Sequence, residues 1–397
     1  MVIQTLRVRL ALFLTLFLWA GASVAQIAIA PDVTTVSRTL LGDMRLEIGL
    51  SAKTTYRVSH RASPPRIIVD LKDADLADLP LLQSPSIVKM TAGRFSEGWS
   101  RIILELTRPL IVQSAGYQTG GQGTVLDLYF KRGNDSDLAS QISTERPMLA
   151  DAAVQIPETA SNKVLVALDP GHGGIDPGAI RDGVAEKNIA LDFGLEVAAL
   201  LRGTGRYDVI LTRSDDHFVA LSRRVRIAQK AKADIFISLH ANTVTRGNAS
   251  GATMYVLSDV ASDPASAALA ELENRADFVA GFDADAPQDD IASVLISLSR
   301  GATGARSRMA AKALVDSFSA SVGVIQSHPM RSANFRVLRA HDMPSVLVEL
   351  GFLSNAGDRA RMQSPVWRAS AADALLNALD VWRNQDRRDV MLSGAGQ

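Results

Sequence analysis

The sequence contains no cysteine among its 397 residues. Disulfides and thiolate ligands are therefore excluded, and any bound metal must be held by histidine, aspartate or glutamate. An excess of one charge is also missing, since 42 basic residues balance 42 acidic ones. A balanced chain has no strong attraction for nucleic acid or for an anionic membrane surface. We therefore expect no nucleic acid among its partners.

A hydrophobic run long enough to cross a bilayer is missing as well. Two arginines precede an apolar stretch at residues 10–20, which is shorter than the ~20 residues that a membrane-spanning helix needs. Small residues follow it and form a small-x-small cleavage site that ends at Ala25. We interpret residues 1–25 as a secretory signal peptide cleaved near Ala25, which leaves no stable membrane span. An uncleaved anchor is the alternative.

Residues 27–131 have a pattern typical of β-strands. Short runs such as RIIVDL and SRIILELT are separated by turn residues, and apolar and polar residues alternate in several of them. Alternation indicates sheets with one face in water, which close most simply as a sandwich. We predict an all-β sandwich-like domain, in which His60 is interpreted as a surface residue. The polar residues 132–161 are expected to form a linker.

The pattern changes from residue 162 onward. Apolar runs such as KVLVALD, DIFISLH and RVLR are interpreted as strands, and they alternate with amphipathic helical segments such as LSRRVRIAQKAK. Strands that are apolar throughout and alternate with helices indicate a mostly parallel sheet flanked by helices. We predict an α/β domain over residues 162–386, followed by a frayed tail over residues 387–397.

Three of these predicted strands end near a residue that can bind a metal or carry a proton. His172 follows VLVALDPG, His240 ends DIFISLH, and Glu349 lies at the end of SVLVEL. Functional sites in such sheets form at the carboxyl ends of the strands, so we expect the three side chains at one edge. Glu186 begins a predicted helix shortly after His172, within reach of the same edge.

Two histidines and one glutamate are a common set of catalytic zinc ligands, which leaves a fourth position open for water. His172, Glu186 and His240 match this set, and Glu349 is then available as the proton carrier. Taken singly, each residue has an ordinary explanation: a histidine in a turn, or a glutamate beside the positive end of a helix dipole. Glu349 is harder to explain in this way, because a carboxylate buried in an apolar strand is costly unless it is paired or functional.

Two aspartates in the glycine-rich segment after His172 are interpreted as turn residues. Asp176 and Asp182 both lie among glycines, where aspartate is common for reasons of backbone conformation alone. We therefore assign them no part in the site.

Four segments resemble a known family. LDPGHGGIDPGA, EKNIAL, ADIFISLHAN and PSVLVELGFLSN are similar, in this order, to the motif blocks of the zinc-dependent N-acetylmuramoyl-L-alanine amidases, in particular the AmiC-like group that splits daughter-cell walls. The resemblance covers about residues 163–385. It implies that one Zn²⁺ is bound by His172, Glu186 and His240, and that Glu349 is the catalytic carboxylate.

The same resemblance implies a reaction and a place. The substrate would be peptidoglycan, cleaved at the amide between N-acetylmuramic acid and L-alanine of the stem peptide, and the enzyme would act in the periplasm in septal wall splitting and cell separation. Residues 27–131 are similar to the AMIN module, most clearly in GRFSEGWSRIILEL. That module implies peptidoglycan binding and targeting to the septum.

Residues 259–301 form a predicted helical insert with apolar residues at helical spacing, as in DPASAALAELENRADFVAGF. The plain interpretation is a helix packed on the domain. In the AmiC-like amidases the corresponding insert is a regulatory helix that covers the zinc, adds a glutamate to it, and is displaced by a LytM-type activator protein. The resemblance thus implies autoinhibition through Glu273, while Glu271 on the other side of the apolar stripe stays open.

Two other functions remain as alternatives. A different zinc amide hydrolase, such as a carboxypeptidase, would release a terminal amino acid instead of an intact stem peptide. A wall-binding scaffold with an inactive hydrolase fold would contain no zinc.

Overall fold

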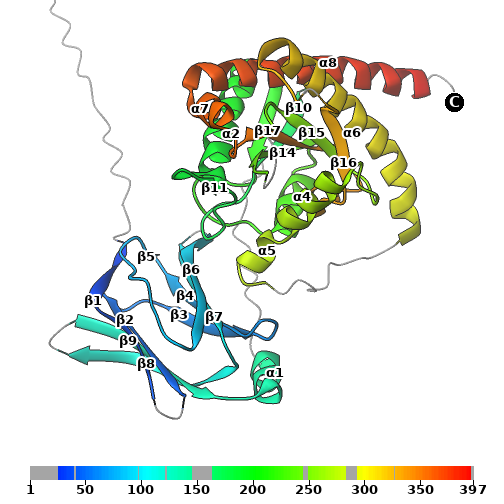
Figure 1. Ribbon diagram of the computed structural model, residues 1–397. Coiled ribbons are helices and arrows are strands. Elements are labelled where there is room, and N and C mark those ends of the chain that lie inside the picture. The colour runs from blue at the N-terminus through cyan, green and yellow to red at the C-terminus, as the bar shows by residue number, and fades with distance from the viewer. Residues whose placement is uncertain are drawn as a thin grey trace, which may run out of the picture.

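The computed structural model describes residues 26–39, 42–96, 98–120, 123–144, 163–244, 249–282, 293–325 and 327–394. The predicted signal peptide, most of the predicted linker and part of the predicted insert lie outside these residues. Within them the chain forms an all-β part followed by an α/β part (Figure 1). None of the described helices combines the length and the apolar character needed to cross a membrane.

The all-β part consists of two mostly antiparallel sheets that share one hydrophobic core. The first sheet has the order β5-β1-β2-β9-β8 and the second has the order β3-β4-β7-β6. Leu46 and Leu128 of the first sheet meet Ile67 and Leu104 of the second in this core. The strands are β1 (Ile27–Arg38), β2 (Met44–Leu50), β3 (Tyr56–Arg61), β4 (Arg66–Lys72), β5 (Ala74–Asp75), β6 (Ile87–Ser96), β7 (Trp99–Leu106), β8 (Leu110–Gly120) and β9 (Gly123–Arg132).

Alternation along these strands explains the sandwich. In β2, Leu46 and Ile48 face the core, whereas Arg45 points outward and forms a two-point ion pair with Asp127 of β9, at 2.7 and 2.9 Å. The predicted all-β domain is confirmed. The interpretation of His60 as a surface residue is wrong, because its side chain is buried against Phe130. A six-residue strand has too few positions for its alternation to show which face is buried.

The first residues of the predicted linker are helical. Helix α1 (Asp135–Thr144) places Leu138 in a buried position, and the Gln141 side chain accepts a hydrogen bond from the Val112 main chain at 3.2 Å. This stretch therefore packs on the sandwich, and residues 145–161 lie outside the described part of the chain.

The α/β part is built on a six-stranded sheet with the order β13-β10-β14-β17-β15-β16. The first four of these strands are parallel, and β15 runs antiparallel to β17. The predicted mostly parallel sheet is confirmed. Its strands are β10 (Val164–Pro170), β13 (Tyr207–Leu211), β14 (Ile235–Asn242), β15 (Thr253–Leu257), β16 (Met330–Ala333) and β17 (Ser345–Phe352), and a small hairpin is formed by β11 (Ile180–Arg181) and β12 (Val184–Ala185).

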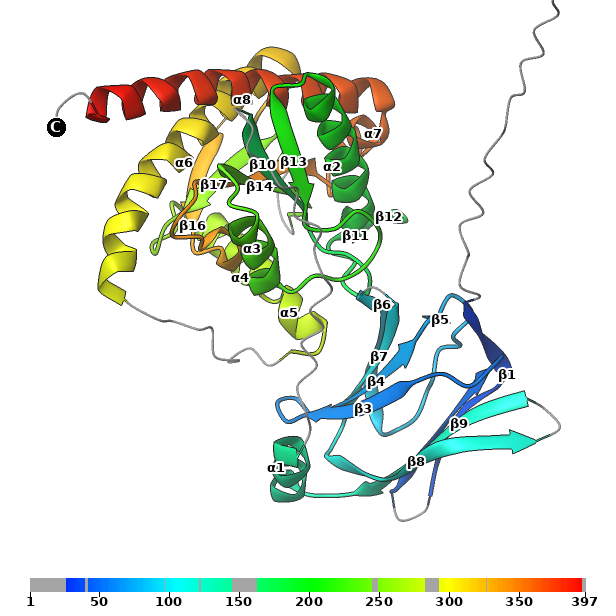
Figure 2. The same ribbon diagram turned by 180° about the vertical axis from the view of Figure 1, so that it is seen from behind.

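Helices cover both faces of this sheet (Figures 1 and 2). Val166 and Leu168 of β10 pack on the face of α2 (Glu186–Gly203), α6 (Ser293–Ser321) and α8 (Pro365–Gly394), while Leu165 and Ala167 pack on the opposite face. That opposite face is covered by α3 (Leu221–Lys230), α4 (Pro264–Asn274), α5 (Ala276–Val279) and the 3₁₀ turn η1 (Arg336–Leu338). Helix α7 (Ala356–Gln363) follows β17.

Two details of the α/β part differ from the prediction. The run RVLR is not a strand: Val337 and Leu338 are adjacent and both buried, which suits a tight 3₁₀ turn and not an alternating strand. Helix α8 also continues to Gly394, so that most of the predicted tail is helical.

Candidate metal centre

The loop after β10 brings its main chain against a histidine ring. A Cβ atom on Gly171 would lie 2.5 Å from Cε1 of His240, so only glycine allows this approach. The next residue, His172, has a φ of 57°, in the left-handed region that costs a side-chain-bearing residue about 1–2 kcal/mol. This backbone conformation aims the His172 ring at His240, with ring centroids 4.9 Å apart.

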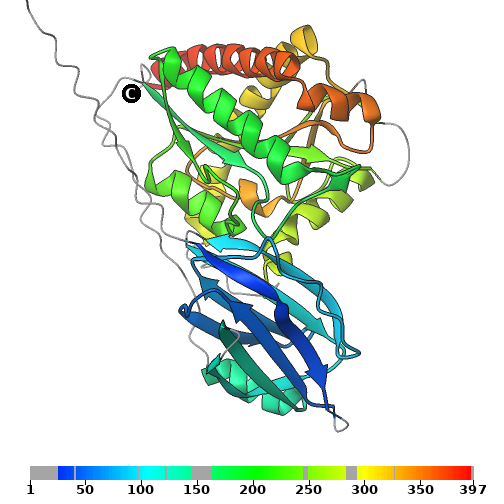
Figure 3. The ribbon, with the colours of Figure 1, turned by 90° about the vertical axis from the view of Figure 1, so that its left-hand side faces the viewer.

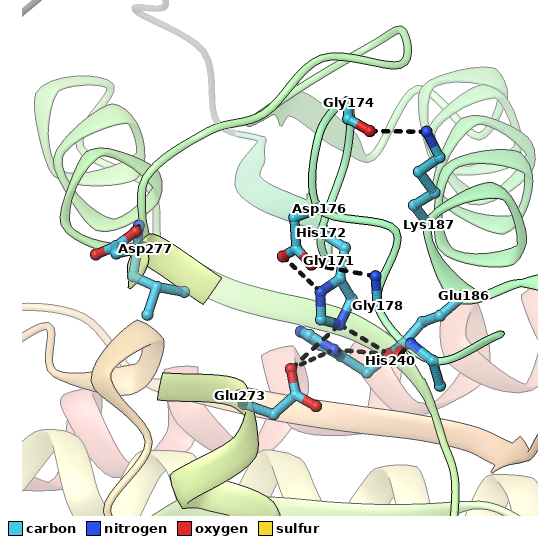
Figure 4. Close-up of polar contacts among 12 residues, drawn as sticks. Gly171, His172, Gly174, Asp176, Gly178, Glu186, Lys187, His240, Glu273 and Asp277 are labelled. Atoms are coloured by element: carbon cyan, nitrogen blue, oxygen red, sulfur yellow. Dashed lines mark hydrogen bonds and ion pairs between the residues drawn. The ribbon is translucent and has the colours of Figure 1, made fainter. Parts of the chain in front are cut away.

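Four side chains converge at this point (Figure 4). One ligand atom from each of His172, Glu186, His240 and Glu273 lies within 4.8 Å of the others, and all four residues are buried. Nε2 of His172 lies 3.2 Å from both a Glu186 oxygen and a Glu273 oxygen. Nδ1 of His240 lies 3.0 Å from the same Glu186 oxygen and 3.3 Å from the same Glu273 oxygen. The structure therefore brings the three predicted ligands together.

Glu186 is the first residue of α2, directly after the β11–β12 hairpin. Its carboxylate accepts hydrogen bonds from the main-chain N–H groups of Ala179 and Ala241, both at 2.9 Å. Burial by itself would raise the pKa of Glu186, but the neighbouring His172 and His240 hold it well below its ordinary value. The group is thus a carboxylate anion fixed from two sides of the site.

Asp176 determines which nitrogen of His172 faces the cluster. One Asp176 oxygen lies 2.8 Å from Nδ1 of His172, and the other accepts a hydrogen bond from the Gly178 main chain at 3.2 Å. When the ring is neutral, a proton held on Nδ1 by Asp176 leaves the Nε2 lone pair free to bind a metal. Burial would lower the pKa of His172, yet the carboxylates of Glu186, Asp176 and Glu273 raise it well above its ordinary value.

The interpretation of Asp176 as a turn residue missed this role. Its position four residues after His172 was the available signal, but the contact depends on the left-handed turn between them. Asp182, by contrast, is exposed and forms an ion pair with Arg359 outside the cluster.

Two buried arginines hold the loop from behind, and the sequence analysis did not identify either. Arg224 donates to the main-chain oxygens of Pro170 and His172 at 2.7 and 2.6 Å, and to Asp169 at 2.8 Å. Arg213 donates to the Gly171 oxygen at 2.8 Å. These bonds satisfy carbonyls at the end of β10 and in the loop that follows it, and so maintain the strained conformation of His172.

Glu349 lies in β17 beside His240 of β14, in register across the parallel pair. Its side chain is 0% exposed, and neither carboxylate oxygen forms a hydrogen bond of ordinary geometry within the described part of the chain. Burial raises the pKa of Glu349 well above its ordinary value, and the negative charges of Glu186 and Glu273 raise it further. A glutamate in this environment readily takes and holds a proton.

Glu273 and Glu271 lie on different sides of α4. This helix begins after Asp263, whose side chain accepts a hydrogen bond from the Ser266 main chain at 2.9 Å. Leu269 is buried on the same side as Glu273, one helical turn earlier, whereas Glu271 is exposed. The structure thus places Glu273 in the cluster and Glu271 outside it.

The donor set fits a divalent metal ion. Two imidazole nitrogens and two carboxylate oxygens are borderline ligands of the kind that zinc takes. Bonds of about 2.0–2.1 Å in a tetrahedral site separate the donor atoms by roughly 3.3 Å, and the four distances between nitrogens and oxygens here are 3.0–3.3 Å. The buried Nε2 of His172 also lacks a hydrogen-bond partner among the described residues. The cluster is a metal site.

Comparisons with known proteins give the same result for both parts of the chain. Residues 166–381 match the family model of N-acetylmuramoyl-L-alanine amidases, and residues 36–128 match the AMIN domain. The amidase match contains every residue of the cluster and Glu349. The resemblance stated from the four motif segments is therefore confirmed.

Characterised relatives align over most of the chain. N-acetylmuramoyl-L-alanine amidase AmiC of Neisseria meningitidis serogroup B is 29% identical over 86% of this chain and 87% of its own length. The AmiC of Escherichia coli O6:H1 is 26% identical over 85% of this chain and 86% of its own length. N-acetylmuramoyl-L-alanine amidase AmiA of Salmonella typhimurium is 36% identical over 62% of this chain and 85% of its own length. This chain belongs to the N-acetylmuramoyl-L-alanine amidase family, with an AMIN domain ahead of the amidase domain.

Proposed function

We propose that this amidase is a zinc enzyme that cleaves the bond between N-acetylmuramic acid and L-alanine in peptidoglycan, and that Glu273 keeps it inactive at rest. The observation that carries the proposal is the cluster itself. His172, Glu186 and His240 supply the three-ligand set of a catalytic zinc, and Glu273 lies at ligand distance where a catalytic site keeps an open position.

Each residue of the cluster has its own proposed role in binding the metal. His172 and His240 offer ring-nitrogen donors, and Glu186 offers a carboxylate whose orientation is fixed by two main-chain N–H groups. When bound, Zn²⁺ supplies Lewis-acid chemistry: it polarises a carbonyl oxygen and lowers the pKa of water from about 15.7 towards about 7. Asp176 holds the His172 ring in the required tautomer.

Glu349 is the proposed proton carrier. Its buried carboxylate lies next to His240 in the neighbouring strand, on the side of the cluster that the sheet provides. A carboxylate with a raised pKa accepts a proton from the attacking water and donates it to the amine of L-alanine as the amide bond breaks. Without that donation the amine would leave as an unstable anion.

Glu273 blocks this chemistry in the resting enzyme. One Glu273 oxygen lies within 3.3 Å of ring nitrogens of both His172 and His240. The Glu273 side chain is buried between α4 and the cluster. A substrate carbonyl and a water cannot share a position that a carboxylate fills. Activity then requires α4 to move away, and a LytM-type activator protein is the proposed cause of that movement.

The proposed setting is the periplasm, during septal wall splitting and cell separation. The signal peptide expected at residues 1–25 supports export, and the similarity to proteins named AmiC over 85–86% of this chain supports the setting. The AMIN domain is proposed to bind peptidoglycan and to direct the enzyme to the septum.

The test combines metal content with product analysis. Purified full-length protein is assayed for bound metals, and purified sacculi are digested with the wild-type protein and with an activated variant. We expect about one zinc per chain and the release of intact stem peptides that begin with L-alanine, identified by mass spectrometry. Release of single terminal amino acids would indicate a carboxypeptidase, and absence of both zinc and products would indicate an inactive wall-binding scaffold.

A further inference from the structure

Two arginines of the sandwich contact the segment that follows α4, residues 276–282. Arg66 of β4 donates a hydrogen bond to the main-chain oxygen of Phe278 at 2.8 Å, and Arg101 of β7 donates to the main-chain oxygen of Ala280 at 2.7 Å. Both arginines are only 3% exposed. Both carbonyls lie at the end of the short helix α5, where main-chain oxygens are not fully used by the helix. The Phe278 oxygen also accepts a hydrogen bond from the Gly281 main chain at 3.0 Å.

Arg101 is held by contacts within the sandwich that do not involve the segment. Its guanidinium forms a two-point ion pair with Asp70 of β4 at 2.6 and 2.9 Å, and it lies over the Phe95 ring at 3.3 Å from the centroid. Burial of a charged pair is costly unless its remaining donors are also satisfied. The carbonyl of Ala280 accepts one of those donors, so docking of the segment completes the buried pair.

Apolar contacts surround the two arginines. A Cβ atom on Gly281 would lie 2.7 Å from Cδ1 of Ile68 and 3.2 Å from Cδ1 of Ile103, so the backbone of the segment lies directly on the sheet. The Phe282 ring lies 5.9 Å from that of Phe95. Figure 3 shows the sandwich packed against one end of the α/β part, where these contacts occur.

The same segment is continuous with the helix that carries Glu273. Arg275 donates its main-chain N–H to Leu272 of α4 at 3.1 Å and accepts a bond from Val279 of α5 at 3.0 Å, so the two helices share one hydrogen-bonded junction. Glu273 is the next-to-last residue of α4. Figure 1 shows α5 directly after α4, so a constraint on α5 acts on a helix end that lies within one turn of Glu273.

We propose that the AMIN domain clamps the blocking segment: Arg66, Arg101 and the apolar surface around them hold residues 276–282 and thereby keep Glu273 against the metal site. This inference rests on the proposed role of Glu273. The clamp would make the sandwich a regulatory domain, because any event that separates the sandwich from residues 276–282 frees α4 to move.

The test uses the full chain with Arg66→Met, which keeps the length of the side chain but removes the bond to Phe278 and the stacking of the guanidinium at 4.2 Å from the Phe278 ring. The matched control is Arg57→Met, because Arg57 lies over Trp99 at 4.7 Å entirely within the sandwich. Hydrogen exchange of residues 264–282 and basal hydrolysis of sacculi are both measured. We expect Arg66→Met to raise both by about 5–30-fold, and Arg57→Met to raise neither.

A second pair of variants separates the clamp from the proposed function. Glu273→Gln by itself should raise basal activity, and Arg66→Met added to it should then have little further effect on activity while still increasing exchange. Phe278→Ala, which weakens the same contact from the segment, should reproduce the effect of Arg66→Met even if that variant harms the sandwich.

The possible failures are distinct. If Glu273→Gln raises activity but Arg66→Met and Phe278→Ala change neither exchange nor activity, the clamp is wrong and the blocking role stands. If Arg66→Met increases hydrogen exchange of residues 264–282 but Glu273→Gln leaves activity unchanged, the blocking role of Glu273 is wrong. The AMIN domain then holds the segment without controlling activity.

Discussion

At the scale of single residues, the site depends on the direction in which each donor atom points. His172 adopts a left-handed backbone conformation, Asp176 selects its free nitrogen, and two main-chain N–H groups orient Glu186. Glu349 differs from these because, among the described residues, neither of its carboxylate oxygens has a hydrogen bond of ordinary geometry. His172 and Glu186 are thus fixed by hydrogen bonds, whereas Glu349, the proposed proton carrier, is left adjustable.

Replacement of Glu349 by Gln should retain metal binding and abolish hydrolysis. Glutamine matches the shape of a protonated glutamate, so the buried site has no new cavity, but it cannot accept the proton of the attacking water. We expect zinc content and melting temperature to be preserved and the rate on sacculi to fall by at least about 100-fold. Retained activity would remove Glu349 from the mechanism.

Replacement of Asp176 by Asn should weaken metal binding. The amide cannot hold the Nδ1 proton of His172 as a carboxylate does, so the ring loses its fixed tautomer. We expect zinc affinity, measured by competition with a chelator, to fall by about 10–100-fold. Asp182→Asn is the control, because this exposed residue of the same segment pairs only with Arg359 in the described structure; an equal loss in both variants would contradict the assignment.

At the scale of elements, β10 and α4 approach the site from different directions. The carboxyl end of β10 leads into the His172 loop, which the buried side chains Asp169, Arg224 and Arg213 hold in place. Helix α4 brings a single carboxylate from the other side. The loop is fixed by a network of buried polar bonds, whereas the position of α4 depends on how its ends are packed.

The Glu273→Gln variant tests α4 as the blocking element. The amide binds a metal more weakly than a carboxylate, so the fourth position should open without loss of the helix. We expect basal hydrolysis of sacculi without an activator to rise by about 10-fold or more, since about 1.4 kcal/mol of lost stabilisation corresponds to a factor of ten. Glu271→Gln, two residues away on the exposed side, should behave as wild type.

The Asp169 network predicts a pH-dependent stability. Burial would raise the pKa of Asp169, but the charge of Arg224 and the hydroxyls of Ser238 and Thr212 lower it below its ordinary value. A lowered pKa stabilises the fold above the unfolded value of 3.8, and this contribution is lost as the pH falls through the folded pKa. Asp169→Asn should therefore cost about 3–5 kcal/mol at pH 7.

The same cost should begin to shrink below about pH 4, where Asp169 becomes protonated in the unfolded chain, and should be smallest below the folded pKa, where the folded carboxyl is protonated as well. Urea unfolding of both proteins at a series of pH values measures this difference. A cost that stays constant down to pH 2 would show that the charge of Asp169 is not what stabilises the loop.

At the scale of the whole molecule, the two domains are joined by a shared hydrophobic core. Ile68, Phe95 and Ile103 of the sandwich cluster with Phe218 and Ala280 of the amidase domain. Main-chain contact adds to this, since Ile175 donates a hydrogen bond to the Arg94 oxygen at 3.1 Å. The AMIN domain is thus packed next to the loop that follows His172 as well as on residues 276–282.

Phe95→Ala should uncouple the two domains. Its ring stacks near Phe218 and Phe282 across the interface, and removal of a buried phenylalanine costs about 3–5 kcal/mol. We expect the AMIN and amidase domains of the variant to unfold in two calorimetric transitions. Their melting temperatures should differ by more than any difference seen in the wild type. An unchanged unfolding profile would show that the shared core does not couple the domains.

The sequence alone was enough to predict both folds and the convergence of the cluster. Periodicity of two and of 3.6 residues is local information, and strands that end in His240 and Glu349 must meet at one edge of a parallel sheet. It did not show that Asp176 orients His172, that RVLR forms a turn, or that Arg224 lies behind the loop. These depend on backbone conformation or on partners far away in the chain.

The tertiary structure alone decided how the domains meet and which glutamate of α4 enters the site. Glu271 and Glu273 flank the same apolar stripe in the sequence, and only the packing of α4 on the sheet turns Glu273 inward. The bonds from Arg66 and Arg101 to Phe278 and Ala280 join residues more than 170 positions apart. No local pattern records such contacts, because main-chain carbonyls accept hydrogen bonds whatever side chain they carry.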